Sequence, residues 1–191
     1  STLTAITAQN TVAVTAVHEI PTDVITAQIN AVLTDIEVDS VKTGMLSSSA
    51  IIECVAAALT HHRVERLVVD PVMIAKSGDA LLREDAIGSL RTRLLPLAMV
   101  VTPNIPEAEA LTETTITSDA DVRRAAEAIV GMGARSVVVK GGHREGPATD
   151  LFYDGSEFRE FTSPRFDTVN THGTGCTFAS AVAAGVARGM L

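Results

Sequence analysis

Short valine-rich segments alternate with segments of helical periodicity along the whole chain, and this alternation constrains the fold more than any other feature. Apolar residues recur at helical spacing in residues 24–36 and 51–59, whereas residues 67–69 and 137–139 are uninterrupted apolar runs. Such short apolar runs are typical of parallel strands that are covered on both faces. The sequence therefore predicts one α/β domain over residues 1–191, with a mostly parallel central sheet between two layers of helices.

Local sequence signals indicate the remaining elements. Pro21 suits the first turn of a helix, where its missing N–H costs nothing, and Ser118 with Asp121 forms the pattern of a capping box. Asp154-Gly155 lies at the centre of a hairpin pattern. We expect further strands at residues 3–8, 12–17, 38–42 and 98–101, further helices at residues 85–95, 106–111 and 174–189, and a hairpin at residues 151–161.

Composition and charge exclude several classes of function. The 191 residues carry a formal net charge of -8, whereas non-specific nucleic-acid binding requires a surface rich in Lys and Arg. No apolar stretch approaches the roughly 20 residues of a membrane span. Cys54 and Cys176 form neither a disulfide framework nor a zinc-ligand pattern. We therefore expect a cytoplasmic protein with reduced thiols and with no nucleic-acid or membrane partner.

Unusual short motifs follow four of the expected strands. They are Lys42-Thr43-Gly44-Met45, Asp70-Pro71-Val72, Thr102-Pro103-Asn104 with Glu107, and Lys140-Gly141-Gly142-His143. Ligands bind at the carboxyl ends of the strands in open α/β sheets. We therefore expect these motifs to converge on one edge of the sheet.

The segment from His172 to Cys176 has the features of an anion site. Gly173 and Gly175 allow a tight turn that exposes backbone N–H groups, and the dipole of the helix that follows Thr174 adds partial positive charge. Such a site suits a phosphoryl group in transfer, but a plain glycine turn before a helix has the same pattern. A cysteine in the first helical turn favours the thiolate, which can take a proton from a substrate hydroxyl; a small buried cysteine is the alternative.

Three charged residues near the strand ends are candidates for binding a metal and a nucleotide. Asp70 and Glu107 suit Mg²⁺, which takes one or two carboxylates and keeps several waters. Lys140, beside two glycines, suits contact with phosphate. Each has a structural alternative: a strand-ending turn for Asp70, a first-turn charge that the helix dipole favours for Glu107, and a solvated surface position for Lys140.

Eight short motifs, taken as a set, resemble those of one enzyme family. They are Ala8-Gln9-Asn10-Thr11, Lys42-Thr43-Gly44-Met45-Leu46, Asp70-Pro71-Val72-Met73, Ala75-Lys76-Ser77-Gly78-Asp79, Thr102-Pro103-Asn104, Pro106-Glu107-Ala108, Val139-Lys140-Gly141-Gly142-His143 and Asn170-Thr171-His172-Gly173-Thr174-Gly175-Cys176. In this order they resemble the hydroxymethylpyrimidine/phosphomethylpyrimidine kinases of the ribokinase-like superfamily. Sugar kinases of that superfamily usually carry Asp at the position of Cys176, so the cysteine points to the pyrimidine kinases.

The resemblance implies a three-layer α/β/α fold of ribokinase type and a reaction that uses ATP and Mg²⁺. The implied activity is phosphorylation of hydroxymethylpyrimidine and then of its monophosphate, in thiamine biosynthesis. The resemblance also implies roles for single residues. Gln9 would hydrogen-bond the pyrimidine, and Met45 and Val72 would pack against it. An anion hole would be formed by Gly173, Thr174, Gly175 and Cys176, with Cys176 as general base, while Asp70 and Glu107 would help to hold Mg²⁺ and Asn104 and Lys140 would lie at the nucleotide phosphates.

The resemblance also implies partners and departures. Family members usually form homodimers, and some are fused to a thiamine phosphate synthase domain. They begin with a strand and a Gly/Ser-rich loop and end with further helices, so we expect this chain to lack both ends. Two alternatives stay open: a pyridoxal kinase or another alcohol kinase of the superfamily, and a truncated ligand-binding domain without catalysis.

Overall fold

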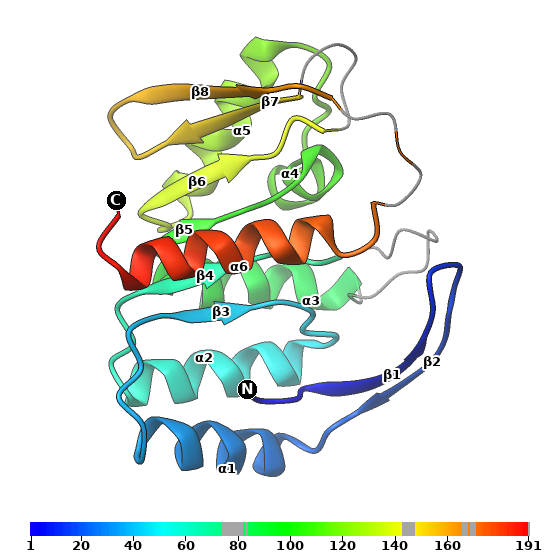
Figure 1. The fold of residues 1–191 in the computed structure, drawn as a ribbon, viewed down its shortest axis with the longest axis vertical. Helices are drawn as coiled ribbons and strands as arrows, with labels where there is room; N and C mark the ends of the chain where they lie inside the picture. Colours follow the sequence, from blue (N-terminus) through cyan, green and yellow to red (C-terminus); the bar gives the residue numbers. More distant parts are fainter. Residues whose placement is uncertain (74–81, 83, 143–147, 166–167, 169–170, 191) are drawn as a thin grey trace.

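The computed structural model describes most of the chain (Figure 1). The described residues are 1–73, 82, 84–142, 148–165, 168 and 171–190. The motif at residues 75–79 and the two motif residues His143 and Asn170 lie outside the described residues.

A six-stranded sheet forms the centre of the molecule (Figure 1). Its strands are, in spatial order, β3 (Val41–Thr43), β4 (Leu67–Val69), β5 (Val100–Val101), β6 (Ser136–Val139), β7 (Ala148–Tyr153) and β8 (Phe158–Ser163). The neighbours from β3 to β6 pair in parallel, and β7 and β8 add antiparallel strands. The carboxyl ends of β3 to β6 therefore share one edge, which confirms the prediction of a mostly parallel sheet.

Helices cover both faces of this sheet. Five helices contribute buried side chains to the larger of two apolar clusters: α1 (Thr22–Leu33), α2 (Ser49–His61), α3 (Glu84–Ser89), α4 (Ile105–Thr112) and α5 (Asp119–Gly131). The other face carries α6 (Thr174–Ala187). Among the described residues, no helix has both the length and the apolar character needed to cross a membrane.

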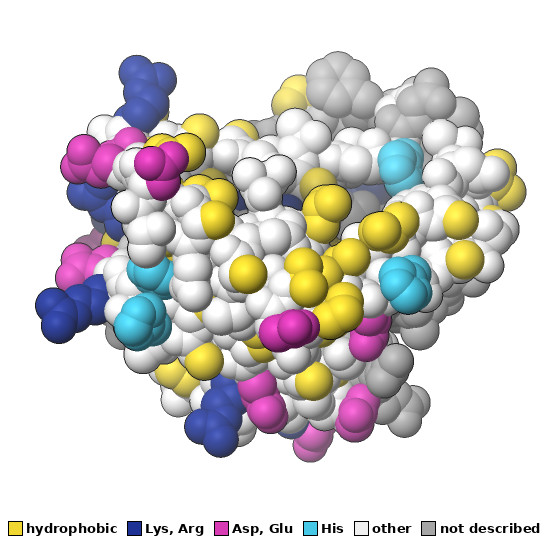
Figure 2. All heavy atoms as spheres, turned by 90° about the horizontal axis from the view of Figure 1, so that it is seen from below, with side chains coloured by type: hydrophobic (Ala, Val, Ile, Leu, Met, Phe, Trp, Pro, Cys, Tyr) yellow, Lys and Arg dark blue, Asp and Glu magenta, His cyan; other side chains and the backbone are white. Residues whose placement is uncertain are grey.

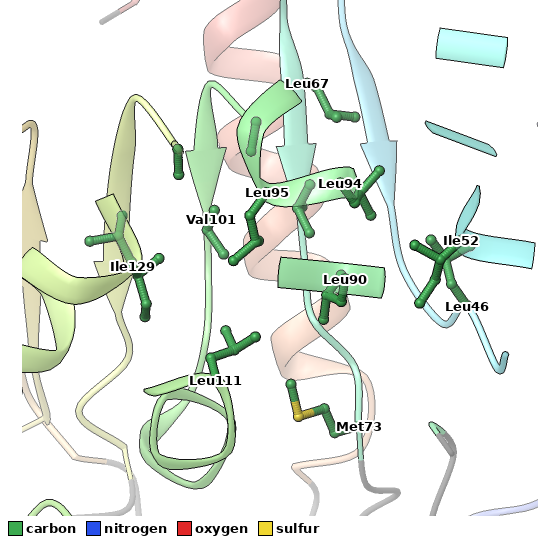
Figure 3. Close-up of a cluster of buried hydrophobic side chains, with 14 of the residues drawn as sticks. Leu46, Ile52, Leu67, Met73, Leu90, Leu94, Leu95, Val101, Leu111 and Ile129 are labelled. Atoms are coloured by element: carbon green, nitrogen blue, oxygen red, sulfur yellow. The ribbon is translucent and has the colours of Figure 1, made fainter. Parts of the chain in front are cut away.

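The period-two geometry of the strands divides the core into these two clusters. Leu67 and Val69 of β4 belong to the cluster that the five helices cover. Figure 3 shows this cluster, with Leu90, Leu94 and Leu111 among its labelled side chains. Val68, between Leu67 and Val69, packs instead with the α6 cluster because successive strand side chains point to opposite faces. The three-layer architecture is thus confirmed.

A separate antiparallel hairpin precedes the main sheet. It consists of β1 (Ala5–Gln9) and β2 (Val14–Glu19). Gln28 of α1, a polar residue in an otherwise apolar helical stripe, bonds the backbone of Leu3 through both its amide oxygen and its amide nitrogen, each at 3.1 Å. Thr4 also donates to the carbonyl oxygen of Met45 at 3.0 Å. These bonds hold the hairpin beside the loop that follows β3.

The regular helix expected at residues 85–95 is divided in the structure. After α3 the chain forms a π-helical turn (Leu90–Leu94) and then a 3₁₀ turn (Leu95–Leu97). Pro96 gives the physical reason, because it has no N–H to donate and its ring clashes with the carbonyl four residues earlier in a regular α-helix. Leu90, Leu94 and Leu95 all remain buried, so the change of helix type keeps the apolar face on the core.

Candidate active site

Asp70 lies at the centre of the charged groups at the carboxyl edge. It follows β4 and is only 2% exposed. Its Oδ1 accepts hydrogen bonds from the Lys140 Nζ at 3.2 Å and from the Thr102 Oγ1 at 3.3 Å. Within the described residues its Oδ2 accepts no hydrogen bond, but it lies 3.5 Å from the Nζ of Lys42. Two ammonium groups therefore compensate one buried carboxylate, as a charge in such a place requires.

The start of α4 places Asn104 and Glu107 at the same edge. The Asn104 Oδ1 accepts from the backbone N–H of Glu107 at 2.9 Å, and the Asn104 backbone N–H donates to the Glu107 Oε2 at 2.8 Å. This reciprocal pair is a capping box. An isolated parallel bridge between Asn104 and Lys140 joins this helix start to the end of β6.

Glu107 is buried, and burial has a direct electrostatic consequence. Desolvation raises the pKa of Glu107 to about 7, and the negative charge of Asp70 adds to the rise. Hydrogen bonds from the backbone of Asn104 and of Met73 and the positive charge of Lys140 oppose it. The pKa of Glu107 thus depends on both Asp70 and Lys140, which shows that the three groups share one electrostatic environment.

The N-terminus of α6 lies against Lys140. Gly173 is the N-cap residue with φ of 78°, a left-handed conformation that glycine adopts at little cost. A methyl group at Gly175 would lie 3.4 Å from the Lys140 Nζ, so the ammonium lies next to this helix start. The first N–H groups of a helix have no partner within it, and Cys176 is exposed in the first turn. An anion at this position can therefore be bound both by the ammonium group of Lys140 and by the backbone N–H groups at the start of α6.

The three residues expected at the pyrimidine come from two parts of the fold. Met45 and Val72 are half-buried and follow the neighbouring strands β3 and β4. Gln9 lies exposed at the end of β1. The hydrogen bond from Thr4 to the Met45 carbonyl attaches the hairpin to the loop of Met45. Hairpin and strand ends thus border the same side of Asp70.

The carboxylates of Asp70 and Glu107 fit a magnesium ion that is bound together with phosphates. In the described part of the chain, no group of three or more His, Cys, Asp or Glu residues is arranged to hold a metal alone. However, the Asp70 Oδ2 is buried without a hydrogen bond, and the Asp70 charge acts on Glu107. Mg²⁺ typically takes one or two carboxylates and completes its shell with water and substrate phosphate.

Two contributors to the site were not assigned a role from the sequence. Lys42 belongs to the motif Lys42-Thr43-Gly44-Met45, but its ion pair with Asp70 forms only because β3 and β4 are neighbours in the sheet. Thr102 follows β5, the next strand in the sheet. The capping box at α4 could have been found from the Asn-x-x-Glu spacing of Asn104 and Glu107.

Comparisons with known proteins show which sequences this chain resembles. A family model described as phosphomethylpyrimidine kinase matches residues 1–191. The chain is 48% identical over 191 residues to the hydroxymethylpyrimidine/phosphomethylpyrimidine kinase of Bacillus subtilis, which covers 99% of this chain and 70% of that protein. It is 50% identical over 190 residues to the thiamine biosynthesis bifunctional protein ThiED of Geobacter sulfurreducens, covering 99% of this chain but spanning only 39% of that longer protein.

A solved structure gives the corresponding comparison of folds. The Bacillus subtilis pyridoxal kinase, determined as an ADP complex, superposes with a TM-score of 0.88 at 38% sequence identity. The match covers 98% of this chain and 72% of that one. The shared fold therefore extends over the sheet edge where the charged residues meet.

We predict that Glu107→Gln stabilises the chain near pH 8 and leaves its stability unchanged near pH 5. The pKa of Glu107 is about 7 in the folded chain and ordinarily 4.5. The folded state therefore binds more protons between these values, and the free energy of unfolding falls as pH rises through that window. Glutamine stays neutral, so the variant does not lose the free energy of unfolding, on the order of 2–3 kcal/mol, that the parent chain loses over this pH range.

Urea unfolding of both proteins at the two pH values measures this difference. Glu109→Gln on the same helix is the control, since Glu109 is only half-buried. An equal effect of Glu107→Gln at both pH values would contradict the electrostatic explanation.

Proposed function

The chain belongs to the phosphomethylpyrimidine kinase family, and we propose that it phosphorylates hydroxymethylpyrimidine, and then the resulting monophosphate, with ATP. The observation that carries this proposal is the convergence of Lys140, Asp70 and Glu107 beside the N-terminus of α6. Phosphoryl transfer needs alignment and charge neutralisation more than covalent catalysis. A lysine, two carboxylates and a helix N-terminus at one edge are the groups that such a reaction uses.

The donor side of the site is formed by β6, α4 and α6. Lys140 and the N–H groups of α6 bind the phosphates of ATP, and the ADP complex of a relative with the same fold supports a nucleotide here. Asp70 and Glu107 would hold Mg²⁺, which neutralises charge on the phosphoryl group that is transferred. Asn104 has its side-chain oxygen engaged by Glu107, so its amide N–H₂ remains to donate to phosphate.

The acceptor side is formed by β3, the end of β4 and the hairpin. Met45 and Val72 pack against the pyrimidine, and Gln9 bonds its ring. The hydroxymethyl oxygen attacks the γ-phosphorus of ATP, the bond from that phosphorus to the β-phosphate oxygen breaks, and ADP leaves. The hydroxyl proton passes to the Sγ of Cys176, which is the general base.

A pyridoxal kinase is the second candidate, because the solved pyridoxal kinase superposes with a TM-score of 0.88. Mass spectrometry of products tests both activities, with Mg-ATP and either hydroxymethylpyrimidine or pyridoxal in parallel. We expect pyrimidine mono- and diphosphate. Pyridoxal phosphate alone would replace the proposal with the second candidate, and no product from either acceptor would favour a ligand-binding domain without catalysis.

We predict that Cys176→Ala lowers kcat about 100-fold while the KM for ATP changes less than about threefold, since a general base acts in the transition state. Steady-state kinetics with the pyrimidine acceptor measures both parameters. Cys54→Ala is the control, because Cys54 lies on α2 with its Sγ 3.1 Å from the Oγ1 of Thr26. Similar losses in kcat and ATP affinity would remove Cys176 from the role of base.

We also propose that the chain forms a homodimer through the hairpin and α1. These elements expose large apolar side chains, which Figure 2 shows gathered over one face of the molecule. They include Leu3, Ile6, Val12, Val17 and Val24, each at least 43% exposed. Soluble monomers rarely expose large contiguous apolar patches, and a second copy would cover this one.

We predict that Ile6→Lys weakens self-association at least about tenfold, because a buried lysine in an apolar interface is costly. Sedimentation equilibrium measures the dimer constant. Phe161→Lys is the matched control, since Phe161 is 57% exposed on β8 and Ile6 is 56% exposed on β1. A monomeric parent chain, or equal weakening by both substitutions, would refute this interface.

A further inference from the structure

Lys42 is a charged residue of the site that the proposed reaction leaves without a role. It lies on β3, its side chain is 19% exposed, and its Nζ is 3.5 Å from the Oδ2 of Asp70. Among the described residues, Asp70 forms ion pairs with Lys42 and Lys140. Lys140 already supplies a hydrogen bond to Asp70 at 3.2 Å. Two ammonium groups thus face the Asp70 carboxylate, and Lys42 is the less tightly engaged of the two.

We propose that Lys42 binds the phosphate of the monophosphate acceptor and thereby determines that the chain accepts a second phosphoryl group. This inference rests on the proposed function and assigns a residue to its second step. Lys42 is then a specificity-determining residue, whereas Lys140 serves the nucleotide in both steps.

The strand order places Lys42 on the acceptor side of Asp70. β3 lies on one side of β4, whereas β5 and β6 lie on the other (Figure 1). The two lysines therefore approach Asp70 from opposite directions. Lys42 is followed by Gly44 and Met45, and the carbonyl of Met45 is bonded to the hairpin through Thr4. Met45, and Gln9 of the same hairpin, are among the residues expected at the pyrimidine.

The second transfer creates the need for a cation at this position. A phosphate monoester carries a charge of about -1.5 to -2 at neutral pH, and it must approach a donor that is itself polyanionic. Two like charges at the short distances of an active site repel strongly when water is largely excluded. The alcohol acceptor of the first transfer brings no such charge. A lysine on the acceptor side therefore matters chiefly for the monophosphate.

The local backbone leaves room for this ammonium group. A methyl group added at Gly44 would lie 3.1 Å from the Nζ of Lys42, closer than ordinary contact. The absence of a side chain at Gly44 thus leaves space for the ammonium group beside the loop.

The inference is tested by comparing the two acceptors on the purified chain. Calorimetry gives the dissociation constants of hydroxymethylpyrimidine and of its monophosphate, and initial rates with Mg-ATP give the two transfers. We expect Lys42→Met to weaken the monophosphate about 10- to 100-fold, the loss of one charge-assisted contact, and the alcohol less than about threefold. Lys42→Arg restores most of the monophosphate affinity, because guanidinium also binds phosphate. Lys140→Met is the control and lowers both transfers by the same factor.

The outcomes separate this inference from the proposed function. If Lys42→Met weakens both acceptors equally, or neither, Lys42 only compensates Asp70 and the inference is wrong, while the kinase function stands. Thermal unfolding of the variant shows whether that compensation is lost. If the parent chain binds neither pyrimidine, the proposed function fails, and the assignment of Lys42 fails with it.

Discussion

The buried carboxylate of Asp70 is the interaction on which the rest of the site depends. It connects the ends of four parallel strands, because its partners Lys42, Thr102 and Lys140 stand on or directly after β3, β5 and β6. An unpaired buried charge costs several kcal/mol, so both lysines must stay close while no ligand is bound. These lysines are also the groups that a phosphate attracts. The charges that hold the strand ends together are therefore the charges available for binding.

The same arrangement explains which parts of the fold were predictable from the sequence. The strand at residues 67–69 and the capping box of Ser118 were predicted correctly, because a buried apolar triplet and a capping pattern are local signals. The helix at 85–95 was only partly right. Its apolar periodicity continues through Leu94, but Pro96 interrupts the hydrogen bonding and the chain changes helix type. Periodicity reports which face is buried, whereas the type of turn depends on single residues.

The position of the site could be predicted from the sequence more easily than the contacts between its residues. That motifs after parallel strands meet at one edge follows from topology alone, and Asp70, Glu107 and Lys140 do meet there. The partner of each charge depends instead on strand order, which the sequence does not state. Lys42 pairs with Asp70 because β3 and β4 are neighbours, although 28 positions separate the two residues in the chain. The roles assigned to Gln9, Met45, Val72 and Cys176 stay predictions, since each needs a ligand to be observed.

The start of α4 shows how one set of polar atoms serves both fold and site. The Asn104 Oδ1 and the Glu107 Oε2 are engaged in the capping box, which satisfies two N–H groups that the helix cannot. This leaves the amide N–H₂ of Asn104 as a donor that is fixed in place by the bonds already made, while the Glu107 carboxylate also accepts a hydrogen bond from the backbone of Met73. A phosphate needs a donor and a cation needs a carboxylate, and the capping box holds the Asn104 amide and the Glu107 carboxylate close together. Because Glu107 is buried with a pKa near 7, a bound cation would also stabilise its charged form. The proposed binding of Mg²⁺ at this position would therefore be coupled to the release of a proton.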